Sequence, residues 1–130
     1  MATDRRVKYT KMILRQSLIE VLKEKPISRL TIKELCERAD INRATFYSHY
    51  SDQFDLLKQI ESAFIADINS YLDHFVVEAG ETNMVQILAK IFEYIAQNSE
   101  LCHVLLGNNG DIDFQKDVAE FAVLVFRPIS

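Results

Sequence analysis

The sequence predicts an all-α protein. Its 130 residues include only three glycines and two prolines, too few for the many tight turns of an all-β fold. Apolar residues recur at steps of three and four along most of the chain, which is the spacing of one helix face. We find no segment with a convincing strand pattern.

The first predicted helix spans residues 5–25 and ends at Pro26. A second, of about two turns, begins with the sequence Thr-Ile-Lys-Glu at residues 31–34. These residues have the pattern of a capping box, in which the Thr31 hydroxyl accepts a hydrogen bond from the amide of Glu34, and the Glu34 carboxylate accepts one from the amide of Thr31.

A tight turn is predicted next, because Asp40 adopts the left-handed backbone conformation more readily than most residues. Asn42 is a good N-cap for a helix of about two turns over residues 43–50. Phe46 and Tyr50 share the side of this helix that can bury against the first two helices. The other sides carry hydrogen-bonding groups, from Arg43, Thr45, Tyr47, Ser48 and His49.

Further amphipathic helices are predicted in the second half of the chain. Ser51 or Asp52 caps a long helix that ends at Gly80, and Thr82 caps the next one. We expect the apolar side chains of that next helix to face inward, namely Val85, Leu88, Ile91, Phe92 and Ile95.

The last elements are a short apolar piece at residues 101–106, which ends at Gly107, and a final helix at residues 114–126. Asp111 or Asp113 caps this helix. Its apolar segment, residues 122–126, is expected to lie uncovered in a monomer and to form the interface of a dimer or of a domain-swapped form.

Composition indicates a soluble globular chain, with 48% hydrophobic and 26% charged residues. We expect Cys36 and Cys102 to be buried reduced thiols, the alternatives being a disulfide or a metal site. Neither a signal peptide nor a run of about 18 apolar residues is present, so we expect a cytoplasmic protein without a membrane span.

The net charge of −4 hides an asymmetry between the two ends of the chain. Residues 1–53 hold eleven Lys and Arg against seven Asp and Glu, whereas residues 54–130 hold four against twelve. A basic front favours an anionic partner such as nucleic acid. A solvated charged face on the first helix is the alternative explanation.

Two short helices joined by a turn of three or four residues, and braced by a longer helix, have the spacing of a helix-turn-helix. In that motif the second short helix enters the major groove of DNA by its N-terminal end. The hydroxyls, the guanidinium and the ring hydroxyl at residues 43–49 suit phosphate oxygens and base edges. An ordinary amphipathic helix with a polar outer face is the alternative.

The sequence TIKELCERADINRATFYSHYSD, residues 31–52, resembles the signature of TetR-type bacterial transcriptional regulators. The resemblance is dense over about residues 8–60. It implies a DNA-binding domain at residues 1–52, followed by a helical effector-binding and dimerisation domain at residues 53–130. It also implies a dimer on a palindromic operator, usually a repressor, and no enzymatic activity. Family chains commonly continue further, so we expect this second domain to lack the usual last helices.

The resemblance assigns roles to single residues of the DNA-binding domain. Thr31, Tyr47 and His49 are expected to hold phosphates, and Lys33 with the start of the third helix is expected to reach bases. The full expected DNA-binding set is Thr31, Lys33, Asn42, Arg43, Ala44, Thr45, Tyr47, Ser48, His49 and Gln53. Arg43 is the strongest candidate for reading sequence, because its guanidinium fits guanine O6 and N7.

Two positions depart from the family pattern. The turn glycine of the family is Asp40 here, and the usual lysine at the start of the fourth helix is Gln53. Gln53 is therefore expected to offer a phosphate a neutral hydrogen bond. Fewer counterions would be released, so the salt dependence of DNA binding should be shallower than in a member with that lysine.

A small-molecule effector pocket is expected in the second half, lined by Phe64, Tyr71, Phe75, Phe92 and His103. The alternative is that these side chains are plain core. The sequence indicates no cofactor, no metal site and no nucleophile motif. An adaptor that keeps this fold but acts through a protein partner is the alternative to a DNA-binding regulator.

Overall fold

The computed structural model describes residues 2–79 and 84–125, with side chains for residues 5–73 and 85–123. All regular structure in these residues is helical, which confirms the all-α prediction. The chain divides into two compact units, residues 1–60 and residues 61–130. The predicted division of roles after residue 52 stays a prediction.

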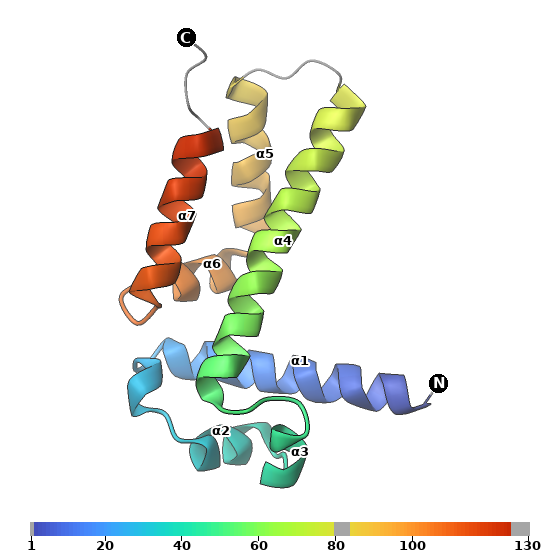
Figure 1. Ribbon diagram of the computed structural model, residues 1–130, viewed down its shortest axis with the longest axis vertical. Coiled ribbons are helices and arrows are strands. Elements are labelled where there is room, and N and C mark those ends of the chain that lie inside the picture. The colour runs from blue at the N-terminus through green and yellow to red at the C-terminus, as the bar shows by residue number, and fades with distance from the viewer. Residues whose placement is uncertain (1, 80–83, 126–130) are drawn as a thin grey trace. The chain divides into compact units, whose positions relative to one another are not determined.

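The first unit is built from three helices, a short 3-10 helix and the first turns of a fourth helix (Figure 1). These elements are α1 (Ala2–Leu22), η1 (Ile27–Arg29), α2 (Ile32–Ala39), α3 (Arg43–Tyr47) and α4 (Gln53–Ala79). Contacts join α1 to α2 and α2 to α3. The two short helices are thus braced by the long first one, as the sequence predicts.

The core of the first unit takes one or more side chains from each of these four helices. Phe46 of α3 is 0% exposed and is the largest of the fully buried side chains. Burying a phenylalanine contributes roughly 1.5–3 kcal/mol, so this one ring supplies much of the attachment of a five-residue helix. The other fully buried side chains of this unit are Leu14, Leu18, Val21, Leu35 and Leu56.

Two salt bridges link α2 to the residues that directly follow α1. Lys25 Nζ lies 2.6 Å from Glu34 Oε1, and Arg38 Nη2 lies 3.3 Å from Glu24 Oε2. Glu34 therefore does not complete the predicted capping box among the described hydrogen bonds. Its carboxylate takes the charged lysine instead, and only the bond from the Glu34 amide to Thr31 Oγ1, 3.1 Å long, is formed.

The start of α4 resolves the choice between two predicted caps. Asp52 is the N-cap, because its Oδ1 accepts from the amide of Asp55 at 2.8 Å. Asp55 Oδ2 accepts in turn from the amide of Ser51 at 2.9 Å. This bond, followed by one from Gln59, lowers the pKa of the Asp55 carboxyl.

The second unit consists of the remainder of α4 with α5 (Met84–Gln97), α6 (Ser99–Leu106) and α7 (Ile112–Val125). Within it α4, α5 and α7 run alongside one another (Figure 1). Edge-to-face aromatic contacts join these three helices. The centre of the Phe64 ring on α4 lies 5.9 Å from those of both Tyr94 on α5 and Phe114 on α7. None of the described helices is long and apolar enough to cross a membrane.

The loop between α6 and α7 follows the predicted signals. Gly107 ends α6, and Asp111 caps α7 by accepting from the amide of Asp113 at 2.9 Å. Gln115 Nε2 donates to the carbonyl oxygens of Leu105 and Gly107, at 3.2 and 2.8 Å, which ties the loop to the first turn of α7. The caps predicted at Gly80 and Thr82 lie outside the described residues.

The inward face predicted for α5 is wrong for Val85, Leu88 and Phe92, whereas Ile91 and Ile95 line an apolar cavity inside the second unit. Val85 and Phe92 are 74% and 65% exposed, and Leu88 and Ile95 are each 38% exposed. The buried side of this helix carries Tyr94 instead, which is 8% exposed. Because α5 is apolar on two sides, its periodicity alone does not determine which side meets the core.

Candidate nucleic-acid interface

Three residues, Asp40 to Asn42, join α2 to α3. Asp40 has φ 56° and ψ 47°, the left-handed conformation that the sequence predicts for it. The amide of Ile41 donates to the carbonyl of Cys36 at 2.9 Å, and the amide of Asp40 donates to that of Glu37 at 3.2 Å. These two bonds make a Schellman ending, so the angle between the two short helices is set by the backbone itself.

Asn42 starts α3 as its N-cap, as predicted. Its Oδ1 accepts from the amide of Ala44 at 2.7 Å. An asparagine cap of this kind contributes about 1 kcal/mol, which matters for a helix too short to be stable alone. The cap and the buried Phe46 together determine which side of α3 faces outward.

Aromatic side chains of α3 contact one another and the ring of Tyr50, which follows the helix. The Phe46 ring lies 5.5 Å from Tyr47 in an edge arrangement and 5.6 Å from Tyr50. Tyr50 is 5% exposed, and burial, followed by the charge of Asp55, raises the pKa of its hydroxyl. Phe46 and Tyr50 thus occupy the buried side that the sequence predicts for them.

The outer side of α3 carries the residues expected to touch DNA. Arg43, Ala44 and Thr45, on the first turn of the helix, are all exposed. Tyr47 is 54% exposed, and His49 is half-buried against the Tyr50 ring at 6.3 Å. The structure therefore brings one guanidinium, one methyl and two hydroxyls to the same short surface.

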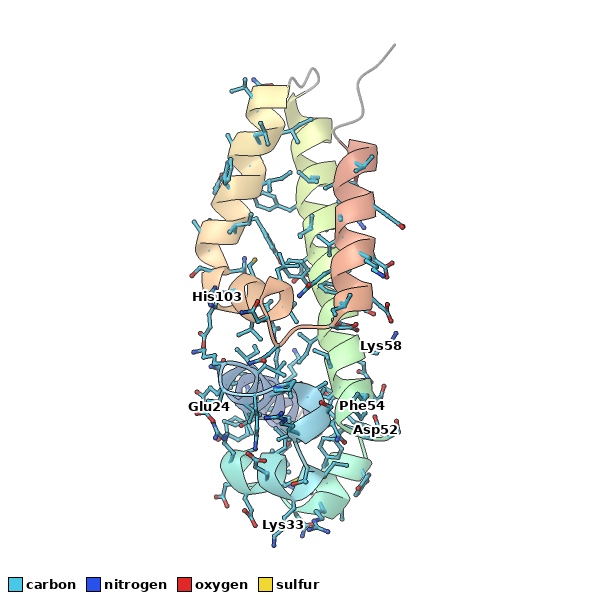
Figure 2. The ribbon with its side chains drawn as sticks, turned by 90° about the vertical axis from the view of Figure 1, so that its left-hand side faces the viewer. Glu24, Lys33, Asp52, Phe54, Lys58 and His103 are labelled. Atoms are coloured by element: carbon cyan, nitrogen blue, oxygen red, sulfur yellow. The ribbon has the colours of Figure 1, made fainter. Side chains whose placement is uncertain are left out.

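Two predicted residues at the start of α2 lie on the exposed surface of the same unit. Lys33, the second residue of α2, is exposed (Figure 2). Thr31 caps α2, with its oxygen accepting from the Glu34 amide. Because a hydroxyl can accept and donate at once, the Thr31 proton remains able to reach a phosphate.

Ser48 and Gln53 are engaged within the protein. Ser48 Oγ donates to the carbonyl oxygen of Thr45 at 2.6 Å, and Gln53 Nε2 donates to that of Leu30 at 2.9 Å. A phosphate needs hydrogen-bond donors, and each side chain already uses a donor here. The bond from Gln53 links the start of α4 to the residue before the α2 cap, a contact that sequence reasoning missed.

The charge of this unit favours an anionic partner. Residues 1–60 hold twelve Lys and Arg against eight Asp and Glu. Two of those acids, Glu24 and Glu34, are paired with Arg38 and Lys25. Helix α1 also carries exposed basic side chains, namely Arg5, Arg6, Lys8, Lys11 and Arg15.

The second unit contains an apolar cavity of about 140 Å³. Phe64 and Tyr71, two of the predicted pocket residues, line it. Phe92 and His103 are exposed and do not line it, and the side chain of Phe75 lies outside the described residues. The lining that the sequence did not single out includes Ile68, Leu72, Ile91, Tyr94, Cys102, Val118 and Phe121.

Tyr71 brings a phenol hydroxyl to the neighbourhood of that cavity. Partial burial, followed by a hydrogen bond with Glu93, raises the pKa of its hydroxyl. The ammonium of Lys90 lies 5.9 Å from the centre of its ring. Cys102 also lines the cavity, and burial raises the pKa of its thiol. Both cysteines are free and buried, which confirms that prediction.

Comparison with known proteins identifies the first unit. Residues 15–60 match the family model described as "Bacterial regulatory proteins, tetR family". The chain is also similar to the "Uncharacterized HTH-type transcriptional regulator YxbF" of Bacillus subtilis (strain 168), with 35% identity over 75 residues. That alignment covers 57% of this chain and 19% of the relative, and thus about a fifth of that protein's length. No solved structure matches the chain.

The match to the family spans the last part of α1, from residue 15, both short helices and the first turns of α4. It therefore contains the three-residue turn, both caps and the outer side of α3. This chain carries in its first unit the helix-turn-helix domain of the TetR family of bacterial regulatory proteins.

Proposed function

We propose that the chain is a transcriptional regulator, acting as a repressor, that binds double-stranded DNA through its first unit. The observation that carries this proposal is the presentation of α3. A left-handed residue and an asparagine cap fix its start, Phe46 fixes its buried side, and the first turn is left exposed. That geometry is the one by which a recognition helix enters the major groove.

Base reading falls to the first turn of α3. The Arg43 guanidinium can donate to guanine O6 and N7, and the Ala44 methyl can pack on the methyl of a thymine. Thr45 and Lys33 are exposed on the same unit and reach further base edges. Asn42 contributes by holding this turn in place, because its side-chain oxygen is used by the cap.

Phosphate contacts position the helix without reading sequence. Thr31, Tyr47 and His49 are suited to this role, since all three carry a donor at or near the surface. We assign Ser48 and Gln53 a secondary role in phosphate binding, because each already donates a hydrogen bond to a backbone carbonyl.

The proposed operator is palindromic and is bound by a homodimer. Two recognition helices must then lie about 34 to 36 Å apart, one turn of DNA. The C-terminal helix α7, on which Val123 is 67% exposed, is the interface that the sequence favours for this dimer.

Release by a small apolar effector is the regulatory part of the proposal. The cavity of about 140 Å³ resembles in size an engineered apolar cavity that holds benzene, and lies below the ~300 Å³ of ordinary ligand sites. A larger effector would therefore have to move the helices that line the cavity. Such a ligand acts only if its affinity differs between the two arrangements.

DNA binding by the 130-residue chain tests the proposal. Fluorescence anisotropy is measured on duplex fragments from beside its own gene, over a range of salt concentrations. Arg43→Ala should weaken the tightest complex about 5- to 150-fold, the value of one bidentate base contact of ~1–3 kcal/mol. Lys58→Ala is the matched control, because it removes one exposed positive charge from α4 instead.

The two variants separate specific reading from general attraction. Unchanged binding by Arg43→Ala, or equal losses in both variants, would contradict the assignment of α3 as the reading helix. A protein adaptor, the alternative function, would show weak DNA binding in the wild type that neither substitution alters.

A further inference from the structure

The positive charge of the first unit is concentrated in one part of α1. Residues 5–19 hold five Lys and Arg and no Asp or Glu. Residues 20–60, which complete the unit, hold seven Lys and Arg against seven Asp and Glu. The two short helices and their turn therefore lie in a stretch without net charge. The attraction of this unit for a polyanion comes mainly from α1.

Four of these five basic side chains lie along one side of α1. Residues 5, 8, 11 and 15 are separated by steps of three, three and four, and residues at such steps are neighbours on a helix surface. All four side chains are exposed. At 1.5 Å per residue they extend over about 15 Å of the helix. We call them the α1 basic row, namely Arg5, Lys8, Lys11 and Arg15.

The α1 basic row has no role in the core of the first unit. The first buried residue of α1 is Leu14, and the described side chains before it are exposed or half-buried. Among the residues that the structure describes, no salt bridge involves the row. A helix face that is merely solvated usually mixes charges of both signs. A row of a single sign favours contact with an anionic partner instead.

Duplex DNA fits this row better than a lipid surface does. A helix that lies on a membrane buries a broad apolar face beside its basic one. The exposed large apolar side chains in the described part of α1 are Tyr9 and Met12, which do not make such a face. The row also belongs to the same compact unit as α3, and in the view of Figure 1 the first turns of α1 extend past α3.

A duplex bound through α3 offers α1 a suitable target. Double-stranded DNA carries one negative charge per ~1.7 Å of its axis, so phosphates continue on both sides of any base pairs that α3 reads. Lysine and arginine contacts to phosphates add affinity without reading sequence, and each one releases counterions.

We propose that the α1 basic row binds phosphates of the DNA duplex outside the base pairs that α3 reads. This inference rests on the proposed DNA binding by the first unit. The two surfaces then have separate roles. Helix α3 supplies the preference for one sequence, whereas α1 supplies much of the sequence-independent affinity and of its salt dependence.

A double variant, Lys8→Gln with Lys11→Gln, tests the row. Glutamine forms helix well, so circular dichroism should be unchanged. The matched control is Lys58→Gln with Lys116→Gln, which removes the same charge from exposed positions on α4 and α7. Fluorescence anisotropy is measured over a range of salt concentrations on two duplexes of equal length. One is the tightest-binding fragment from beside the chain's own gene, and the other has an unrelated sequence.

The row variant should bind both duplexes more weakly by the same factor. Its slope of log affinity against log salt should be shallower by about 1.8 per bound chain, or 0.9 for each lost phosphate contact. The ratio of the two affinities should stay at the wild-type value. The control should keep the wild-type slope, because its charges lie outside the row.

Arg43→Ala separates failure of this inference from failure of DNA binding by α3. A wild-type slope in the row variant, with sequence preference lost in Arg43→Ala, would make the row a solvated face and leave the role of α3 intact. Absence of DNA binding by the wild type would overturn both proposals.

A lipid surface is tested separately with vesicles of mixed phosphatidylcholine and phosphatidylserine. The wild type and the row variant should both fail to sediment with them. Vesicle binding that the row variant loses, with equal DNA affinity in both proteins, would assign the row to a membrane and overturn the inference.

Discussion

Two phenylalanines, one in each unit, both lie in apolar helical patterns, but only one of them is buried. Phe46 in α3 is 0% exposed, whereas Phe92 in α5 is 65% exposed. Helix α3 has one apolar side, so its pattern leaves a single way to pack it. Helix α5 has two, and the one around Tyr94 meets the core. The comparison teaches that periodicity locates a helix reliably, but identifies its buried side only when a single side is apolar.

The two units also differ in net charge. Residues 1–60 have a net charge of +4, and residues 61–130 have a net charge of −8. DNA is attracted to the first unit and repelled by the second, since the field near each unit follows its local charge. The second unit keeps one apolar and uncharged helix surface, which suits contact with protein rather than with DNA.

The largest effect is expected from the two phenylalanines themselves. Phe46→Ala should lower the free energy of unfolding by about 3–5 kcal/mol, because it leaves a cavity in the core of the first unit. Phe92→Ala should change it by less than about 0.5 kcal/mol when the protein is dilute enough to be monomeric. Urea denaturation followed by circular dichroism measures both; similar losses would remove the distinction between the units.

Thr31 caps α2 and is proposed to contact a phosphate. Its substitution should therefore lower both the stability of the protein and its affinity for DNA. Thr31→Ala should cost about 1 kcal/mol of stability, the usual value for an N-cap, and should also weaken DNA binding. Thr31→Ser, which keeps the hydroxyl, should restore most of both. Thermal denaturation and anisotropy check this, and a serine variant as weak as the alanine variant would argue against both roles.

Asp40 should show a smaller effect of the opposite sign. Asp40→Gly is expected to raise stability by about 0.5 kcal/mol, because glycine adopts the left-handed conformation without steric cost. Asp40→Asn keeps the conformational preference and removes the charge. If both variants tighten DNA binding equally, the acidic charge is what matters there; stabilisation by asparagine alone would contradict the conformational explanation.

The smallest effect concerns the salt dependence of DNA binding. Gln53→Lys should steepen the slope of log affinity against log salt by about 0.9, since one more charged group meets a phosphate. Gln53→Ala should leave the slope unchanged and cost about 0.5–1.5 kcal/mol of stability, because the Leu30 carbonyl loses its donor. Weaker DNA binding by the alanine variant without destabilisation would show that Gln53 contacts the phosphate directly.

Local signals account for what the sequence predicted well. The caps at Thr31, Asn42 and Asp52, and the left-handed Asp40, depend on side chains and amides within a few residues of each other. Such contacts are encoded by spacing alone. Sequence spacing was therefore sufficient to locate the helix-turn-helix and the exposed side of α3.

Contacts between distant segments account for what was missed. Glu34 binds Lys25 instead of closing its capping box, and Gln53 donates to Leu30, which is 23 positions earlier. The cavity draws its lining from four helices, so Phe92 and His103 could not be excluded from it by spacing. Each case depends on packing that a one-dimensional pattern does not contain.

The most direct test of DNA binding by the first unit is to map the site of DNA contact on the 130-residue chain. Amide chemical shifts would be measured by NMR as a duplex from beside its own gene is added. We predict that the largest changes fall between Thr31 and His49, with α5 unaffected by DNA at constant protein concentration. Changes centred on the second unit, with the outer side of α3 undisturbed, would contradict the assignment of DNA binding to the first unit.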